Sequence, residues 1–178
     1  MNLKKLTAGD KAPNEVNVLI EIPMNAGPIK YEFDKDLEMI VVDRFMPTSM
    51  SYPCNYGFIP NTLSGDGDPA DVLVYSNHPI VPGAMIKARP IGVLITEDEK
   101  GSDEKILAVP AAKIDPFFEN VNSLKDLPEI VIKKIEHFFE NYKKLEKGKW
   151  VKITGWRDAE DAKAIIKTAI DTHNKQAA

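Results

Sequence analysis

The chain has 178 residues, of which 43% are apolar and 28% charged, and its formal net charge is −4. These values are typical of one globular domain spanning residues 1–178, and they exclude intrinsic disorder, which requires fewer apolar residues and a larger net charge. The acidic balance also argues against a nucleic-acid-binding protein, because such proteins usually gather a basic excess on one face.

The first two-thirds of the sequence predict short strands separated by turn residues. Runs rich in β-branched and other apolar residues occur at residues 16–22, 30–33, 39–45, 72–75, 85–96 and 105–109. Prolines and polar turns interrupt or end these runs, as is typical of strands in a small sheet. Residues 48–59, which include Tyr52 and Tyr56, are punctuated by proline and glycine and predict a loop.

The last third of the sequence changes period. From Pro128, apolar residues recur at steps of three and four as far as Leu145, which predicts a helix with Pro128 in its first turn. Residues 150–156 predict a strand, and Asp158 is suited to cap a final helix with an apolar stripe over residues 162–170. Short strands followed by two helices predict an antiparallel barrel or closed sheet flanked by helices.

The cysteine content and the distribution of apolar residues bear on localisation. The single cysteine, Cys54, excludes an intramolecular disulfide and indicates a small buried side chain rather than a nucleophile. The N-terminal residues lack the apolar run of a secretory signal, and no stretch reaches the roughly 18 apolar residues of a membrane span. We therefore expect a cytoplasmic protein with no membrane or nucleic-acid partner.

Three carboxylates, those of Asp66, Asp68 and Asp71, occur within six residues. A solvated turn would explain this segment if it stood alone, since Asp, Gly and Pro are standard turn formers. However, Gly67 permits a tight bend and Pro69 stiffens the segment, so the carboxylates can be held converging. Converging carboxylates are costly without cations, and hard oxygen ligands favour magnesium or manganese.

A calcium loop of the EF-hand type has the wrong spacing. With Asp66 as position one, the invariant glycine position holds Asp71 and the closing glutamate position holds Asn77. A calcium-buffering function is therefore set aside. A second acidic cluster at residues 97–104 reads alone as an exposed turn, but together with the first loop it could complete a site for several metal ions.

Several basic and phenolic residues have two interpretations. Lys30 and Arg44 lie on predicted strands. Because strand residues alternate between two faces, each one alone is best explained as a residue on the solvent face. Both, however, are of the types that bind phosphate. Tyr52 and Tyr56 fit either half-buried packing or donation to a ligand oxygen. Tyr142 fits the apolar stripe of the predicted helix, so core packing is its default interpretation.

In this order along the chain, the residues resemble those of the family I inorganic pyrophosphatases, especially the short bacterial type. The resemblance covers nearly the whole length and is carried by the segments IEIP, IKYEFDK, VDRFMPTSMSYPCNYGFIP, DGDPADVLV, EDEKGSDEK and HFFENYKKLEKGKWVKITGW. One departure is Ala70, where the family usually has a bulkier aliphatic residue. This position affects packing rather than chemistry.

The resemblance implies a mainly β fold, a five-stranded OB-like closed barrel flanked by two helices, assembled as a homohexamer. It implies hydrolysis of pyrophosphate to two orthophosphates by direct attack of a metal-activated water, which drives pyrophosphate-releasing biosynthetic reactions forward. Several Mg²⁺ ions per site would be the cofactor, with Mn²⁺ or another divalent ion as a substitute.

The resemblance also assigns roles to individual residues. Asp68 would be the general base. The magnesium ligands would be Asp66, Asp71, Asp98 and Asp103. The side chains that hold phosphate oxygens would be Lys30, Arg44, Tyr56 and Tyr142. Further members of the cavity, without individual roles, would be Glu21, Glu32, Tyr52, Lys105 and Lys143.

Two other functions are open on the residues alone. A barrel-type module for single-stranded nucleic acid needs a basic groove with stacked aromatics, whereas the charge near Tyr52 and Tyr56 is mostly acidic. A metal-dependent phosphohydrolase acting on nucleotides or phosphate esters is equally compatible with the carboxylate clusters. Only the resemblance narrows the substrate to pyrophosphate.

Overall fold

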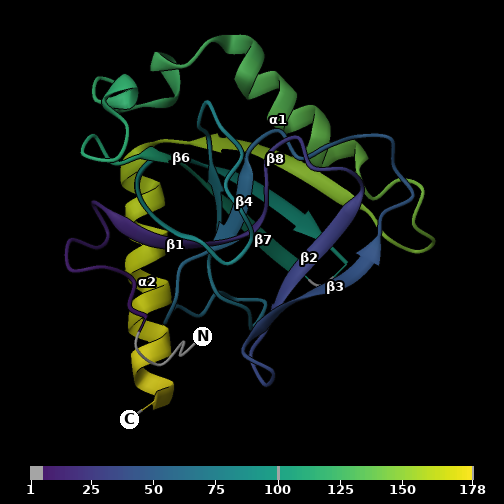
Figure 1. The fold of residues 1–178 in the computed structure, drawn as a ribbon, viewed down its shortest axis with the longest axis horizontal. Coiled ribbons are helices and arrows are strands. Elements are labelled where there is room, and N and C mark those ends of the chain that lie inside the picture. Colours follow the sequence, from purple (N-terminus) through teal and green to yellow (C-terminus); the bar gives the residue numbers. More distant parts are fainter. Residues whose placement is uncertain (1–5, 100, 178) are drawn as a thin grey trace.

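The computed structural model describes residues 6–99 and 101–177 and shows a mainly β fold with two α-helices (Figure 1). The strands are β1 (Val16–Ile22), β2 (Ile29–Asp34), β3 (Met39–Phe45), β4 (Asn55–Phe58), β5 (Asp71–Val74), β6 (Met85–Asp98), β7 (Gly101–Pro110) and β8 (Val151–Arg157). The helices are α1 (Glu129–Asn141) and α2 (Ala159–Ala177), with short 3-10 turns η2 (Pro116–Phe118) and η3 (Leu124–Asp126) before α1.

Five strands close into a ring. Their order is β1-β4-β5-β7-β6, and β6 pairs back onto β1, while β8 extends the sheet from the other edge of β6. The β5–β7 pair is parallel and the other pairs are antiparallel. The expected mainly β fold, with a closed five-stranded sheet and two helices, is therefore confirmed, but the sheet is not wholly antiparallel, because β5 and β7 run parallel.

Strands β2 and β3 form a separate antiparallel hairpin that lies beside the ring (Figure 1). Lys30 pairs with Arg44 across this hairpin, with a register shift just after Lys30. Because directly paired residues project on the same face of a sheet, both basic side chains leave the hairpin on one side.

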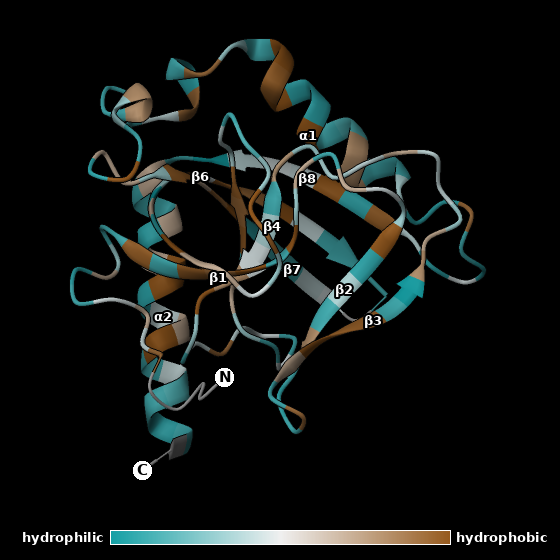
Figure 2. Cartoon of the chain, in the orientation of Figure 1, coloured by the Kyte–Doolittle hydropathy of each residue, from teal (hydrophilic) through white to brown (hydrophobic). Residues whose placement is uncertain are grey.

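The apolar residues of the ring divide between two cores. On β5, Val72 and Val74 belong to a core that also contains Ile166 of α2, whereas Leu73 belongs to a core that contains Phe138 of α1. Successive strand residues point to opposite faces, so β5 is buried on both and its sequence is continuously apolar. Figure 2 shows the matching bands of hydrophobic and hydrophilic residues along both helices.

The prediction of a loop throughout residues 48–59 is wrong at β4. Tyr56 and Gly57 lie in this short strand, paired with Leu73 and Val72 of β5. A Cβ on Gly57 would lie 2.0 Å from the carbonyl oxygen of Leu19 on β1, so only glycine permits the neighbouring backbone to come this close. The glycine that suggested a turn thus marks a close approach of two strands.

The predicted boundaries of the C-terminal helices need one correction. Pro128 is the N-cap of α1, immediately before its first helical residue, and the helix ends at Asn141 with Tyr142 as its C-cap. Residues 142–149 form successive turns instead of continuing the helix, and Leu145 is 72% exposed rather than part of the apolar face.

The cap predicted for the final helix is confirmed. The Asp158 side chain accepts hydrogen bonds from the main-chain N–H groups of Glu160 and Asp161, at 2.9 and 3.1 Å. None of the helices in the described part of the chain is long and apolar enough to span a membrane.

Candidate active site

A cavity of about 420 Å³ opens between the β2–β3 hairpin, the acidic loop before β5 and the β6–β7 hairpin. Nine acidic and six basic side chains line it. Such a concentration of opposite charges in one concave site is typical of binding sites for charged ligands and metal ions. The lining residues include Glu21, Lys30, Glu32, Asp34, Lys35, Arg44, Tyr56, Asp66, Asp68, Asp71, Asp98, Glu99, Asp103, Lys105, Tyr142, Lys143 and Lys149.

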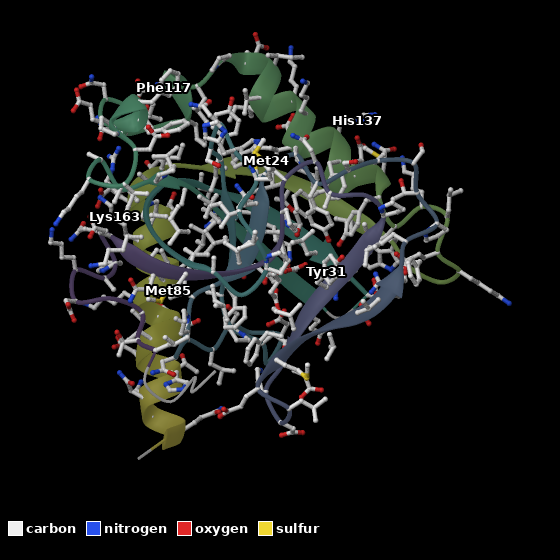
Figure 3. The ribbon with its side chains drawn as sticks, viewed as in Figure 1. Met24, Tyr31, Met85, Phe117, His137 and Lys163 are labelled. Carbon is white, nitrogen blue, oxygen red and sulfur yellow. The ribbon has the colours of Figure 1, made fainter. Side chains whose placement is uncertain are left out.

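A second hollow of about 690 Å³ is larger but chemically different. It lies against α1 and is lined by Met24, Met50, Tyr75 and His137 among others. Figure 3 labels Met24 and His137, which come from the segment after β1 and from α1. This hollow gathers no acidic side chain. The charged cavity is therefore the candidate active site.

The strand register explains why charged residues distant in sequence meet in the cavity. Asp71 is the first residue of β5 and pairs with Lys105 of β7 and with Phe58 of β4. Asp103 lies two residues before Lys105, so both side chains project from the same face of β7. The resulting group of three charges occupies one end of the ring.

Lys105 is the centre of this group. It is only 4% exposed, and its Nζ donates to Asp71 and, at 2.6 Å, to Asp103. Tyr56 donates its hydroxyl to the same Asp71 oxygen at 2.5 Å. Burial opposes the charge on Lys105, but the nearby carboxylates outweigh it and raise the pKa of the ammonium. Lys105 is therefore a fixed positive charge.

A second ion pair lies at the other side of the cavity. Lys143 donates to Asp98 at 2.7 Å, and both side chains are nearly buried. Lys143 follows the C-cap of α1, and Asp98 is the last residue of β6. The turns after α1 thereby hold a cation against the β6–β7 hairpin.

The β2–β3 hairpin supplies two further cations. Lys30 donates to Asp43 at 3.0 Å and to Glu32 at 3.2 Å, while Arg44 contacts Asp43 at 2.5 Å and Glu146 at 3.1 Å. The carboxylates hold both side chains in place and raise the pKa of Lys30, although burial acts in the opposite direction. Figure 3 shows Tyr31 on this same strand, next to Lys30 in the chain.

The acidic loop is shaped by its own hydrogen bonds. The Ser64 N–H donates to the Asp68 carbonyl at 2.8 Å, and the Asp68 N–H donates to the Asp66 side chain at 3.0 Å. Gly67 has φ +89°, a conformation that side-chain-bearing residues rarely adopt. Asp68 is exposed at the rim of the cavity, 3.8 Å from Lys35 Nζ. The loop thus presents two carboxylates toward one opening.

Glu21 is a buried acid in the wall of the cavity. It is 8% exposed and accepts a hydrogen bond from the Phe33 N–H at 2.7 Å. Burial raises the pKa of its carboxyl to about 7, and the Phe33 hydrogen bond only partly opposes that shift. The group is therefore half ionised near neutrality.

This shift predicts the pH dependence of stability. The unfolded pKa is about 4.5 and the folded pKa about 7, so the folded state binds more protons between these values. The contribution of Glu21 is present below about pH 4.5 and is lost as pH rises through about 7. We expect Glu21→Gln to reduce this loss by about 1–3 kcal/mol, because it keeps an acceptor for Phe33 but cannot ionise.

Urea unfolding in chelator at pH 5 and pH 8 measures this effect. The control is Glu140→Gln, the same substitution at an exposed position of α1. Equal pH dependence of unfolding in the native chain and in Glu21→Gln would contradict the prediction.

The carboxylates suit a hard divalent cation in their chemistry, but three of them contact lysines. Burial raises the pKa of Asp66 and of Asp103, so their charges lack full compensation. Within residues 6–99 and 101–177, no three His, Cys, Asp or Glu side chains are grouped to hold a metal ion. Asp71 and Asp103 instead face Lys105, and Asp98 faces Lys143. The oxygen donor set therefore fits magnesium, provided the lysines give way.

The structure brings nearly all of the predicted site residues together. The nine residues expected as base, metal ligands or phosphate donors all line the cavity: Asp66, Asp68, Asp71, Asp98, Asp103, Lys30, Arg44, Tyr56 and Tyr142. Glu21, Glu32, Lys105 and Lys143 line it too. Tyr142 also stacks on Phe138, so its packing in the core is confirmed, while its contact with phosphate stays a prediction.

Tyr52 differs from the other predicted members. It is buried in an aromatic cluster, with its ring centroid 5.4 Å from that of Tyr56 and 4.6 Å from that of Phe138. Its place is behind the tyrosines that reach the cavity. Asp43 and Glu146, which hold Arg44, are not among the predicted site residues. A single charged residue in a strand or turn indicates only exposure to solvent, so the sequence pattern does not distinguish these two.

Comparisons with known proteins agree with this arrangement. The family model described as inorganic pyrophosphatase matches residues 18–174. A Rickettsia prowazekii protein named inorganic pyrophosphatase is 63% identical over 172 residues, covering 96% of this chain and 99% of the relative.

Solved structures give the same result. The inorganic pyrophosphatase of Thermus thermophilus superposes with a TM-score of 0.93 at 46% identity, covering 98% of this chain and 99% of that one. A structure described as inorganic phosphatase from Anaplasma phagocytophilum has a TM-score of 0.94 at 52% identity, with 96% and 99% of the two chains covered.

Proposed function

The chain belongs to the inorganic pyrophosphatase family, whose reaction is the hydrolysis of pyrophosphate, and we propose that it performs this reaction in the charged cavity with magnesium as cofactor. One observation carries the proposal: six basic and nine acidic side chains face a single opening. A substrate that is itself highly anionic needs both fixed cations and metal ions in such a site.

The acidic side chains divide by role. The magnesium ligands would be Asp66, Asp71, Asp98 and Asp103. Mn²⁺ shares the preference for oxygen donors and would substitute. When bound, magnesium neutralises substrate charge and acidifies the attacking water. A metal ion held by Asp71 and Asp103 would free Lys105, and one held by Asp98 would free Lys143, to contact phosphate oxygens.

The basic and phenolic side chains position the substrate. Asp43 of the hairpin contacts Lys30, and Glu146 of the turns after α1 contacts Arg44. Both basic side chains would bind the phosphate groups by charge-assisted hydrogen bonds. Tyr56 and Tyr142 would donate their hydroxyls to phosphate oxygens. Burial raises the pKa of both phenols, so they remain protonated donors at neutral pH.

Asp68 would act as general base. It is the carboxylate of the acidic loop that stays at the rim, 59% exposed and free of any buried ion pair. It would accept a proton from water as the water oxygen bonds to phosphorus. The bond between that phosphorus and the bridging oxygen breaks, and the bridging oxygen leaves with the second phosphate. Nothing in this step requires a covalent enzyme intermediate.

Phosphate release tests the proposal. We expect release from pyrophosphate with magnesium and at least a hundredfold slower release from ATP or a phosphate monoester, the range over which a site discriminates by buried polar contacts. Release should stop in chelator. Equal rates on the three substrates would favour a general phosphohydrolase instead, and absence of release with magnesium would exclude the proposed function.

The cellular setting is part of the same proposal. The length and composition of the chain favour a single domain over residues 1–178, and the distribution of its apolar residues favours a cytoplasmic location. The family resemblance adds a homohexamer, with removal of pyrophosphate from biosynthetic reactions as the role. Light scattering of the purified chain measures its mass in solution.

A further inference from the structure

Thr62 lies within the segment that joins β4 to β5, the same segment that carries the acidic loop. Its side chain is 3% exposed and both hydrogen-bonding functions of its hydroxyl are used. The Oγ1 atom donates to the Ile59 carbonyl at 2.6 Å and accepts from the Ala70 N–H at 2.9 Å. One buried hydroxyl thus joins the two ends of the connection.

These bonds lie where the two ends of the acidic loop come together at Ile59 and Ala70, a place we call the neck of the loop. Ile59 follows the last residue of β4, and Ala70 precedes Asp71, the first residue of β5. The Ile59 N–H also donates to the Ala70 carbonyl at 3.0 Å, so Ala70 is held on both of its main-chain groups. The Ala70 peptide, together with the pairing of Asp71 to Phe58 and Lys105, sets where the Asp71 side chain begins.

The part of the loop beyond the neck has few other anchors. Leu63 donates its N–H to the Ala169 carbonyl of α2 at 2.9 Å, and the tip is closed by the Ser64–Asp68 bond. Gly65, Gly67 and Asp68 are exposed. The tip therefore keeps its own shape, while its orientation toward the cavity depends on Thr62, on the Leu63 contact and on Asn61, whose side chain donates to the Leu6 carbonyl at 2.8 Å.

We propose that Thr62 is a positioning residue that aims the carboxylates of Asp66, Asp68 and Asp71 at one point. This inference rests on the proposed function and adds to it a residue that touches neither substrate nor metal. Loss of the hydroxyl leaves the buried Ala70 N–H without an acceptor, and the neck must move to satisfy it.

Two substitutions at Thr62 separate the hydroxyl from the shape of the side chain. Thr62→Val keeps the volume and removes both hydrogen bonds, whereas Thr62→Ser keeps both bonds and removes a methyl group. If Thr62 only fills space in the core, the two substitutions should affect metal binding in the cavity to a similar extent. If its hydroxyl positions the loop, Thr62→Ser should retain the metal binding that Thr62→Val loses.

Titration calorimetry of Mn²⁺ binding to chelator-treated protein gives a measurement that does not depend on turnover. We expect Thr62→Val to bind Mn²⁺ about fivefold to tenfold more weakly and to lose a similar factor in kcat, the equivalent of one net hydrogen bond, with a smaller change in KM. Thr62→Ser should stay within about twofold of the native chain in both measurements.

The stability control is Ile135→Val, a mild substitution on α1. Ile135 lies in the core that contains Phe138, whereas Ile59 and Ala70 lie in the core that contains Ile166. This control should lower the melting temperature without altering Mn²⁺ affinity. If Thr62→Val lowers only the melting temperature, or if Ser fails to rescue Mn²⁺ binding, the positioning role is overturned. Should the native chain fail to hydrolyse pyrophosphate, the proposed function is lost, but the Mn²⁺ titrations still decide the role of Thr62.

Discussion

Asp68→Asn should lower the turnover of pyrophosphate by about a hundredfold or more while leaving Mn²⁺ binding largely intact. The amide occupies the same space at the rim of the cavity but cannot accept a proton from the attacking water. Because Asp68 is exposed and outside the buried ion pairs, its substitution removes no buried partner and should leave the fold stable. Steady-state phosphate release under saturating magnesium measures the effect.

The control for Asp68 is Asp171→Asn, the same substitution at an exposed position of α2. This variant should match the native chain in turnover and metal binding. Turnover near the native value in Asp68→Asn would remove Asp68 from the role of base. A parallel loss of Mn²⁺ affinity would instead make Asp68 a metal ligand.

The fold was predictable where a local pattern reports the fold directly. The apolar runs of β1 and β5 and the cap at Asp158 have short-range causes, and the structure agrees with them. Strand β4 was not predictable in this way, because Gly57 is required by the approach of Leu19, a residue far away in the sequence. The prediction placed Leu145 on the apolar face of the helix, because the helical spacing of apolar residues continues past Asn141, where α1 ends.

The site was predictable as a set of residues but not as a network. The acidic loop and the family resemblance together identified side chains that line one cavity. No local pattern indicates that Lys105 is buried between Asp71 and Asp103, since this contact depends on the parallel pairing of β5 with β7. Glu146 reaches Arg44 across 102 positions of the chain, which no spacing rule would suggest.

The Lys105 network makes Asp71→Asn the substitution with two separable effects. The variant loses one oxygen ligand, and we expect Mn²⁺ affinity to fall by at least about tenfold, since a lost charge-assisted contact exceeds about 1.4 kcal/mol. It also leaves the buried Lys105 ammonium with Asp103 as its remaining carboxylate partner. Breaking a buried ion pair is costly, so the metal-free protein should lose about 1–3 kcal/mol of unfolding free energy.

Adding Lys105→Met to Asp71→Asn separates the two effects, because it removes the uncompensated ammonium without restoring the ligand. The double variant should regain much of the lost unfolding free energy in chelator but none of the Mn²⁺ affinity. Lys105→Met alone should bind Mn²⁺ more tightly than the native chain, because the ammonium no longer competes for Asp71 and Asp103. An unchanged Mn²⁺ titration in Asp71→Asn would exclude this residue as a ligand, and equal or weaker binding in Lys105→Met would show that the lysine does not compete with the cation.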